Sequence, residues 1–337
     1  MLRRLSRHLP AALAAAALAM GLMGGGAATS APAEPPDVVF VTSDCASGNF
    51  LCPAFAQAAK RTGTRGRIIS PDAREDIVGT LSLLAQQGHD LVIVDFGLAE
   101  PLAKVAPRFP QTRFALFDAP LLIVDGRPSN VAAVLIRPHQ ASYLAGWLAA
   151  RLEQARRGPD VVGVVGGEPI PPVEEFVIGF RAGALRASPG VKVLVGYSRG
   201  FVDPTKCAAV ARSLIARGAG TVFDVAGGCG PGTLSAAKAA GVWAIGVDSD
   251  RAGLGPHILT SVVKRYDRGF ATLMRQTRSG RLALGRTTVL GLRSGGTELG
   301  RISPRVPSRV LRELAGVRQQ IVSGRIRVPG IALPSGP

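Results

Sequence analysis

The stretch Val161-Val162-Gly163-Val164-Val165-Gly166-Gly167 is an uninterrupted apolar run that ends in two glycines. A continuous run, rather than an alternating one, is typical of a strand buried on both faces of a parallel sheet. The run Leu91-Val92-Ile93-Val94, which ends at Asp95, has the same character. Small or polar residues follow both runs, and open α/β sheets bind ligands at such carboxyl ends of strands.

Outward from these two runs, short apolar segments alternate with amphipathic segments along most of the chain. This alternation predicts parallel βαβ units and an α/β fold. Strands are expected at residues 37–42, 66–70, 90–95, 113–118, 130–136, 160–166, 191–197, 221–225, 242–247 and 258–261. Helices are expected at residues 52–61, 74–87, 98–106, 140–156, 172–186, 204–217 and 231–240.

The N-terminus has the three parts of a secretory signal peptide. Three arginines lie within the first seven residues, residues 9–23 are almost purely apolar, and small residues follow as far as Ala33. The alternative is a membrane anchor, but the apolar core is short of the roughly 20 residues that a spanning helix needs. We expect residues 1–33 to be the signal, cleaved after Ala33, with Ala28 and Ala31 as alternatives. No cysteine follows the core for lipid attachment, so the mature protein is expected to be soluble in the periplasm.

About 300 residues remain after the signal, which is typical of two domains. The formal net charge of +17 falls to +14 without the three signal arginines (17 − 3 = 14). Lysines and arginines are scattered singly, and only 5% of residues are aromatic. This pattern favours a solvated basic surface over a nucleic-acid-binding site, which would need clustered charge.

The chain has four cysteines, Cys45, Cys52, Cys207 and Cys229. An even number in an exported protein indicates disulfides. Four cysteines allow three pairings, and proximity favours Cys45–Cys52, which leaves Cys207–Cys229. Metal binding is the alternative, but no CxxC or paired histidine accompanies these cysteines, so neither a metal nor another cofactor is expected.

Four ordered stretches carry a resemblance to a known family. They are Asn130-Val131-Ala132 with residues 137–146; residues 162–167 with 170–171, 176–180 and 182–184; residues 201–206 with 225–230 and 246–250; and residues 258–265. Together they resemble the basic membrane protein (BMP) family of ABC-transporter substrate-binding proteins, over residues 37 to 295.

The resemblance implies a type I periplasmic-binding fold, in which two Rossmann-like lobes enclose a ligand cleft and the chain crosses between them three times. We expect lobe 1 to contain residues 37–137 and 250–283, and lobe 2 residues 138–249 and 284–330. The family implies a binding protein, not an enzyme, that passes a small molecule, often a purine nucleoside, to a membrane permease.

Carried over residue by residue, the resemblance names the residues of the ligand site. Asp248 of Gly246-Val247-Asp248-Ser249-Asp250 would bind ribose hydroxyls, and a carboxylate does accept two hydroxyls at once. Lys264 would reach the ligand, and Phe50 and Phe201 would hold the base. The remaining implied positions are Asp118, Gly227 and Gly228.

Each of these residues also has an ordinary structural role to weigh. Asp248 could cap a helix, Lys264 could extend over the surface, and the phenylalanines could belong to the core. The glycines could form only a tight turn.

The loop after the first strand departs from the family pattern. The family has an acidic pair before Ser-Phe-Asn, whereas this loop reads Ser43-Asp44-Cys45-Ala46-Ser47-Gly48-Asn49-Phe50. Asp44 and Asn49 are expected to substitute in ligand binding. The altered loop leaves room for another heterocycle or a sugar-like solute as the ligand.

Two other functions fit parts of the sequence. An exported enzyme would use Cys229 as a nucleophile with His139 or His257 as its base, but no orienting acid or Gly-x-Ser-x-Gly elbow completes such a site. A ligand-sensing module for a membrane receptor would have the same fold and differ only in its partner.

Overall fold

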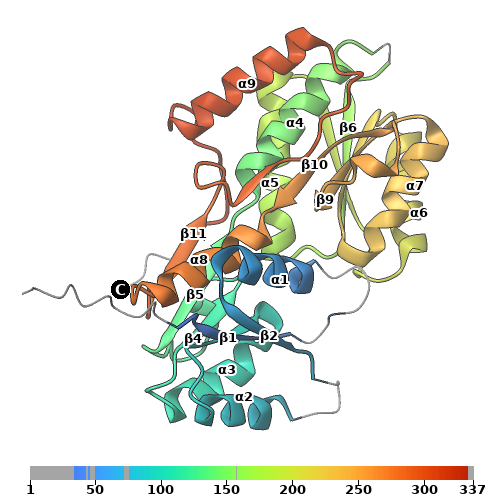
Figure 1. Ribbon diagram of the computed structural model, residues 1–337. Coiled ribbons are helices and arrows are strands. Elements are labelled where there is room, and N and C mark those ends of the chain that lie inside the picture. The colour runs from blue at the N-terminus through green and yellow to red at the C-terminus, as the bar shows by residue number, and fades with distance from the viewer. Residues whose placement is uncertain (1–33, 43–44, 46–49, 72–75, 157, 333–337) are drawn as a thin grey trace, which may run out of the picture. The chain divides into compact units, whose positions relative to one another are not determined.

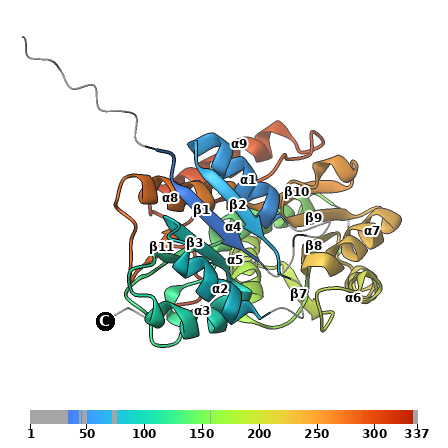
Figure 2. The ribbon, with the colours of Figure 1, turned by 60° about the horizontal axis from the view of Figure 1, so that its bottom comes forward.

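The structure is a computed structural model and describes residues 34–42, 45, 50–71, 76–156 and 158–332. This part of the chain forms two six-stranded sheets, each flanked by helices (Figure 1). The strands of the first sheet lie in the order β11-β5-β4-β3-β1-β2, and all are parallel. They are β1 (Asp37–Val41), β2 (Arg65–Ile69), β3 (Leu91–Asp95), β4 (Phe114–Phe117), β5 (Val131–Ile136) and β11 (Thr287–Leu290). Figure 2 shows β1 between β2 and β3.

The second sheet has the order β12-β10-β9-β8-β6-β7. Its strands are β6 (Val161–Gly166), β7 (Lys192–Tyr197), β8 (Thr221–Val225), β9 (Trp243–Asp248), β10 (Ile258–Lys264) and β12 (Thr297–Leu299). Only β12 is antiparallel to its neighbour, β10. Every residue of β6 is buried, as its continuous apolar run predicts.

Helices cover both faces of the first sheet. On one face α1 (Leu51–Thr62) and α8 (Tyr266–Arg278) pack around a cluster of phenylalanines, in which the rings of Phe117 and Phe270 stack with centroids 3.7 Å apart. On the other face lie α2 (Ile77–Gln86) and α3 (Ala99–Val105) (Figure 1). Both cores are apolar, so the sheet presents its polar groups at the ends of its strands.

The second sheet is covered in the same way. One face packs against α4 (His139–Glu153), α5 (Pro171–Ala187) and α9 (Ser308–Val322). The other packs against α6 (Pro204–Ala216) and α7 (Gly230–Ala240), which lie side by side in Figure 1. Among these helices, α6 begins at Pro204, and the Asp203 side chain accepts a hydrogen bond from Thr205 N at 2.9 Å, as in an N-cap.

The ten strands and seven helices expected from the sequence are all present, with ends that differ by a few residues. Four of the observed strands and α-helices were not in that set: β11, β12, α8 and α9. The missed strands have only four and three residues, which is too short for a periodic pattern to identify. Helices α8 and α9 are amphipathic, with polar residues over most of their surface.

The predicted lobe boundaries differ from the observed strand pairing. Strand β10 pairs with β9 and so belongs to the second sheet, although residues 250–283 were assigned to lobe 1. Strand β11 pairs with β5 in the first sheet, although residues 284–330 were assigned to lobe 2. The chain therefore passes between the sheets after β5, after β10 and after β11. An apolar run predicts that a segment forms a strand. Which strand it pairs with depends on contacts between residues that are distant in sequence.

Both expected disulfides are present, Cys45–Cys52 and Cys207–Cys229. The proposed signal, residues 1–33, lies outside the described residues. None of the helices in the described ranges is long and apolar enough to cross a membrane.

Candidate functional site

Polar residues gather at the carboxyl ends of central strands from both sheets. Asp248 is the last residue of β9, Lys264 is the last of β10, and Asp118 follows β4. Asp118 and Asp248 both have left-handed backbones, with φ of 61° and 64°. Residues other than glycine rarely adopt this conformation, and backbone strain of this kind clusters at functional sites.

An ion pair joins the two sheets at this point. The Lys264 Nζ atom lies 2.5 Å from Asp118 Oδ2, and their side chains are 10% and 9% exposed. Lys264 is therefore not a surface lysine. The Tyr266 hydroxyl, at the start of α8, donates to Asp248 Oδ1 at 3.1 Å. Lys264 also lies above the Tyr266 ring, 5.4 Å from its centroid, so these four side chains form one connected group.

The surroundings of this group shift its proton equilibria. Burial raises the pKa of Asp248, while the nearby Lys264 charge, the Tyr266 hydrogen bond and Arg251 oppose that rise. Burial also raises the pKa of Asp118, and Lys264 opposes this effect. Burial and the two carboxylates hold the pKa of Tyr266 well above its usual value, so this hydroxyl remains a hydrogen-bond donor.

Asp248 does not cap a helix. The neighbouring Asp250 accepts a hydrogen bond at its Oδ1 atom from Ala252 N at 3.0 Å, at the start of a short 3-10 turn (Ala252–Leu254). Asp248 instead accepts from Tyr266 and faces a pocket.

That pocket has a volume of about 470 Å³ and brings together Phe50, Asp248 and Lys264. It is lined by Phe50, Pro53, Ala54, Gln57, Asp248, Ser249, Asp250, Val263, Lys264, Arg265, Tyr266 and Asp267. Phe50 precedes α1 and is half-buried, so its ring is at the pocket wall rather than in the core. An aromatic wall, a carboxylate and a cation suit a ligand with a flat ring and neighbouring hydroxyls.

Phe201, Gly227 and Gly228 form a second group, in the loops after β7 and β8. A Cβ atom added to Gly228 would lie 3.0 Å from the Phe201 carbonyl oxygen, and one added to Gly167 would lie 2.3 Å from the Phe201 ring. Gly227 has φ of 55° and begins a short 3-10 turn. Glycine is thus required here for close approach and for the tight turn.

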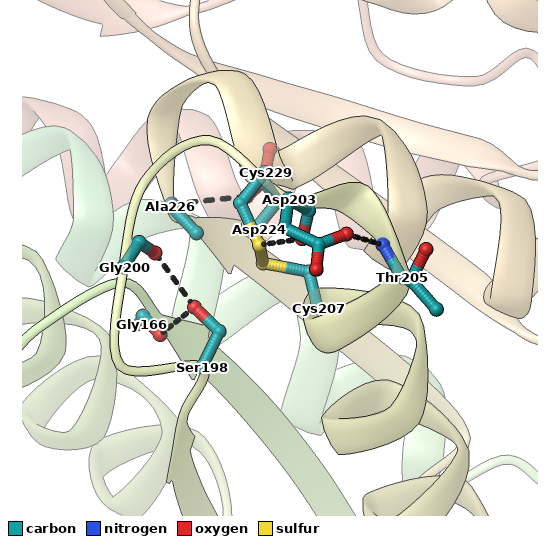
Figure 3. Close-up of a disulfide and its surroundings, with 9 residues drawn as sticks. All are labelled: Gly166, Ser198, Gly200, Asp203, Thr205, Cys207, Asp224, Ala226 and Cys229. Carbon is teal, nitrogen blue, oxygen red and sulfur yellow. Dashed lines mark hydrogen bonds between the residues drawn. A yellow bond between two sulfur atoms is a disulfide. The ribbon is translucent and has the colours of Figure 1, made fainter.

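The Cys207–Cys229 disulfide fixes this second group to helix α6 (Figure 3). The Cys229 Sγ atom lies 2.9 Å from the Asp203 carbonyl oxygen. A disulfide sulfur carries no proton, so this is a close contact rather than a hydrogen bond. Ser198, between the same loops, donates to the carbonyl oxygen of Gly200 at 2.8 Å (Figure 3).

The two groups are thus placed at the carboxyl ends of strands, but only Phe50, Asp248 and Lys264 share a pocket. Asp44 and Asn49, the expected substitutes for the acidic pair, lie outside the described residues.

Comparison with known proteins gives this site a context. Residues 54–332 match the family described as ABC transporter substrate-binding protein PnrA-like. The chain belongs to the Bmp family. It is 26% identical over 288 residues, 80% of this chain and 79% of the relative, to the ABC transporter nucleoside-binding protein BmpA of Lactococcus lactis. Basic membrane protein B of Borrelia garinii is 31% identical over 192 residues, 56% of this chain and 55% of that protein.

Solved structures agree with this assignment to the Bmp family. A solute-binding protein of an ABC transporter system from Aeropyrum pernix superposes with a TM-score of 0.73 at 26% identity, over 88% of this chain and 94% of that one. Another, from Conexibacter woesei, gives a TM-score of 0.69 at 26% identity, over 88% and 99%. The expected type I solute-binding fold is therefore confirmed, and the chain is a substrate-binding protein of the ABC-transporter class.

The structure also contradicts a cysteine-dependent enzyme, because Cys229 is paired with Cys207 and has no free thiol. One of the two histidines suggested as its base, His139 at the start of α4, has its Nδ1 atom 3.1 Å from Glu175 Oε2. Among the described residues, no group of histidine, cysteine and acidic side chains could hold a metal ion.

Sequence reasoning missed three residues that line the pocket or act on residues that line it. Tyr266 carries no motif of its own, although it follows Lys264 by two positions. Asp224 lies in β8 (Thr221–Val225), and an acidic residue within such an apolar run could have been recognised from the sequence as a candidate. Arg251 comes three residues after Asp248, and its guanidinium carbon lies 4.9 Å from the centroid of the Phe50 ring.

Proposed function

We propose that this chain is an exported binding protein that captures a nucleoside and delivers it to the membrane permease of an ABC importer. The observation that carries the proposal is the shared pocket of Phe50, Asp248 and Lys264. The name of the Lactococcus relative, a nucleoside-binding protein, points to the same ligand class.

Each residue of the pocket has a role in this proposal. Asp248 accepts hydrogen bonds from two ribose hydroxyls, because a carboxylate has acceptor sites on both oxygens. Phe50 stacks on the base, an interaction worth about 1–3 kcal/mol. Lys264 donates to the ligand, with its position held by Asp118 at 2.5 Å. Phe201 and the Gly227-Gly228 loop supply the second lobe's wall.

Export and a periplasmic location belong to the same proposal. Residues 1–33 read as a cleavable signal. The two disulfides fit an oxidising compartment, because cytosolic thiols are kept reduced.

The proposed mechanism is hinge closure. Ligand that contacts both lobes stabilises the closed arrangement, and the three chain crossings act as the hinge. The permease then recognises the closed form. A receptor-docking sensor would close in the same way, so genes for a permease and an ATPase beside this one would favour uptake, and a receptor gene would favour sensing.

A thermal-shift screen tests the ligand class. Mature protein is screened against nucleosides, free bases, sugars and amino acids. Ligand at 100 times its dissociation constant stabilises a protein by about 2.7 kcal/mol. We expect a shift with nucleosides that is lost in Asp248→Ala.

Asp125→Ala is the matched control, because Asp125 is exposed and outside the pocket. It should keep the full shift. No shift with any nucleoside, together with a shift from another class, would contradict the nucleoside assignment. An unchanged nucleoside shift in Asp248→Ala would remove Asp248 from the site.

A further inference from the structure

Arg251 lies close to two residues that line the pocket, Phe50 and Asp248, although it is not itself a lining residue. It follows Asp248 by three positions, and its guanidinium carbon is 4.9 Å from the Phe50 ring centroid. Its charge also acts on Asp248 and on the buried Asp224, because it opposes the rise in the pKa of each. A ligand that stacks on this face of the Phe50 ring would therefore meet the guanidinium.

Arg251 has hydrogen-bond donors to offer. Its Nε atom is buried and has no hydrogen-bond partner. The neighbouring carboxylate, Asp250, pairs with Arg301 at 2.7 Å instead. Asp248 Oδ1 accepts from Tyr266. A buried donor without a partner costs free energy, so a ligand atom that accepts from Arg251 would be favoured.

The stem of Arg251 is held in place. Its backbone N donates to Ser261 Oγ at 2.9 Å. A Cβ atom on Gly246 would lie 2.4 Å from the Arg251 Cγ atom, so the glycine leaves room that the stem fills. A held stem reduces the conformational entropy that the side chain loses when it binds.

We propose that Arg251 selects the base of the ligand, by donating two hydrogen bonds to O6 and N7 of a 6-oxopurine nucleoside such as guanosine or inosine. This inference rests on the proposed function, because it assumes a nucleoside with its ribose at Asp248 and its base against Phe50. The base stacks on the face of the Phe50 ring that the guanidinium now covers, and the guanidinium moves to the edge of the base. There its planar fork of N–H donors matches two neighbouring acceptors.

The chemistry of arginine excludes the competing purine. Guanidinium has five donors and no acceptor. Guanine and hypoxanthine present two acceptors, O6 and N7, along one edge, whereas adenine presents the N6 amino donor beside N7. Adenosine would thus face Arg251 with donor against donor, and it should bind more weakly.

Isothermal titration of the wild type and Arg251→Gln with guanosine, inosine, adenosine and guanosine monophosphate tests this inference. Guanosine and inosine should bind the variant roughly 5- to 160-fold more weakly, which is the value of a bidentate arginine–base pair expressed as an affinity ratio. Adenosine should bind the variant at least as well as it binds the wild type, because glutamine can pair with N6 and N7. Arg251→Lys should also lose the preference for guanosine, because an ammonium keeps the charge but not the fork.

Arg305→Gln is the matched control. Arg305 makes the same kind of contact, 4.6 Å from the Trp243 ring centroid, but Trp243 does not line the pocket, whereas Phe50 does. It should leave every affinity unchanged. The inference is overturned if Arg251→Gln weakens all nucleosides equally or none, if Arg251→Lys keeps the preference, or if only the monophosphate loses affinity, which would indicate a phosphate site. If the wild type binds no nucleoside, the proposed function itself fails.

Discussion

Asp224 is a buried residue whose surroundings alter its acid–base chemistry. It lies in β8, is 1% exposed, and accepts a hydrogen bond from Ala226 N at 3.0 Å. Burial raises its pKa to about 7, the Ala226 hydrogen bond and Arg251 oppose the rise, and Asp248 adds to it. The folded protein thus binds this proton more tightly than the unfolded chain does, so stability falls as pH rises through the interval from about 4 to about 7.

Replacing Asp224 by asparagine should flatten this dependence. At about 1.36 kcal/mol per pKa unit, the wild type should lose about 3 kcal/mol of unfolding free energy through Asp224 between pH 5 and pH 8. Urea unfolding at both pH values measures the loss, which should be smaller by that amount in Asp224→Asn. Asp125→Asn, at an exposed site, should keep the wild-type slope. Equal slopes in all three proteins would show that Asp224 does not titrate as argued.

Helices α4 and α5 show how glycine sets the packing of whole elements. A Cβ atom on Gly146 would lie 2.0 Å from the Phe180 carbonyl oxygen, and one on Gly183 would lie 1.9 Å from that of Tyr143. Both contacts are with backbone, which cannot turn aside as a side chain can. The two helices can be this close only because neither carries a side chain at these points.

The substitution Gly183→Ala should therefore destabilise the protein. Overpacking of this kind costs about 1–3 kcal/mol. Gly316→Ala is the control in helix α9, where an added Cβ atom meets nothing within 4 Å. There alanine should stabilise by roughly 0.5–1 kcal/mol, because it loses less conformational entropy in a helix. Chemical unfolding of both variants measures the change in the free energy of unfolding, which should fall for Gly183→Ala and rise for Gly316→Ala. A stabilised Gly183→Ala would refute the close approach of α4 and α5.

At the scale of the whole molecule, the crossings between the sheets carry the proposed hinge. The C-terminal segment is fastened beside the first crossing: Arg137, which follows β5, donates to the Ile331 carbonyl oxygen at 2.7 Å, and Ile331 N donates to Glu175 Oε1 at 2.7 Å. Contacts between Lys264 and Asp118 and between Tyr266 and Asp248 also join the sheets at the pocket. Ligand binding at this point would act on both lobes.

Hinge closure predicts that a saturating nucleoside lowers the radius of gyration. The physical reason is that a ligand with contacts to both lobes binds the closed arrangement better and shifts the population toward it. Small-angle scattering with and without ligand measures the change. Asp248→Ala at the same ligand concentration should show no decrease. Tight binding to the wild type with an unchanged radius would rule out hinge closure.

The sequence by itself determined the local structure of this protein. Continuous apolar runs such as residues 161–165 predict buried parallel strands because both of their faces must avoid water. The spacing of the cysteines favoured the two disulfides that are observed. Ordered motifs identified the Bmp family, and they named Phe50, Asp248 and Lys264, which share one pocket.

Only the tertiary structure decided which distant segments meet. Strands β10 and β11 were assigned to the wrong lobes because strand pairing depends on contacts that no local pattern contains. Lys264 and Asp118 are 146 positions apart and still form an ion pair. Arg251 contacts Phe50, although nothing in the sequence around either residue indicates this contact. Local periodicity reports which face of an element is buried, whereas the partner across a pocket is fixed only when the whole chain has folded.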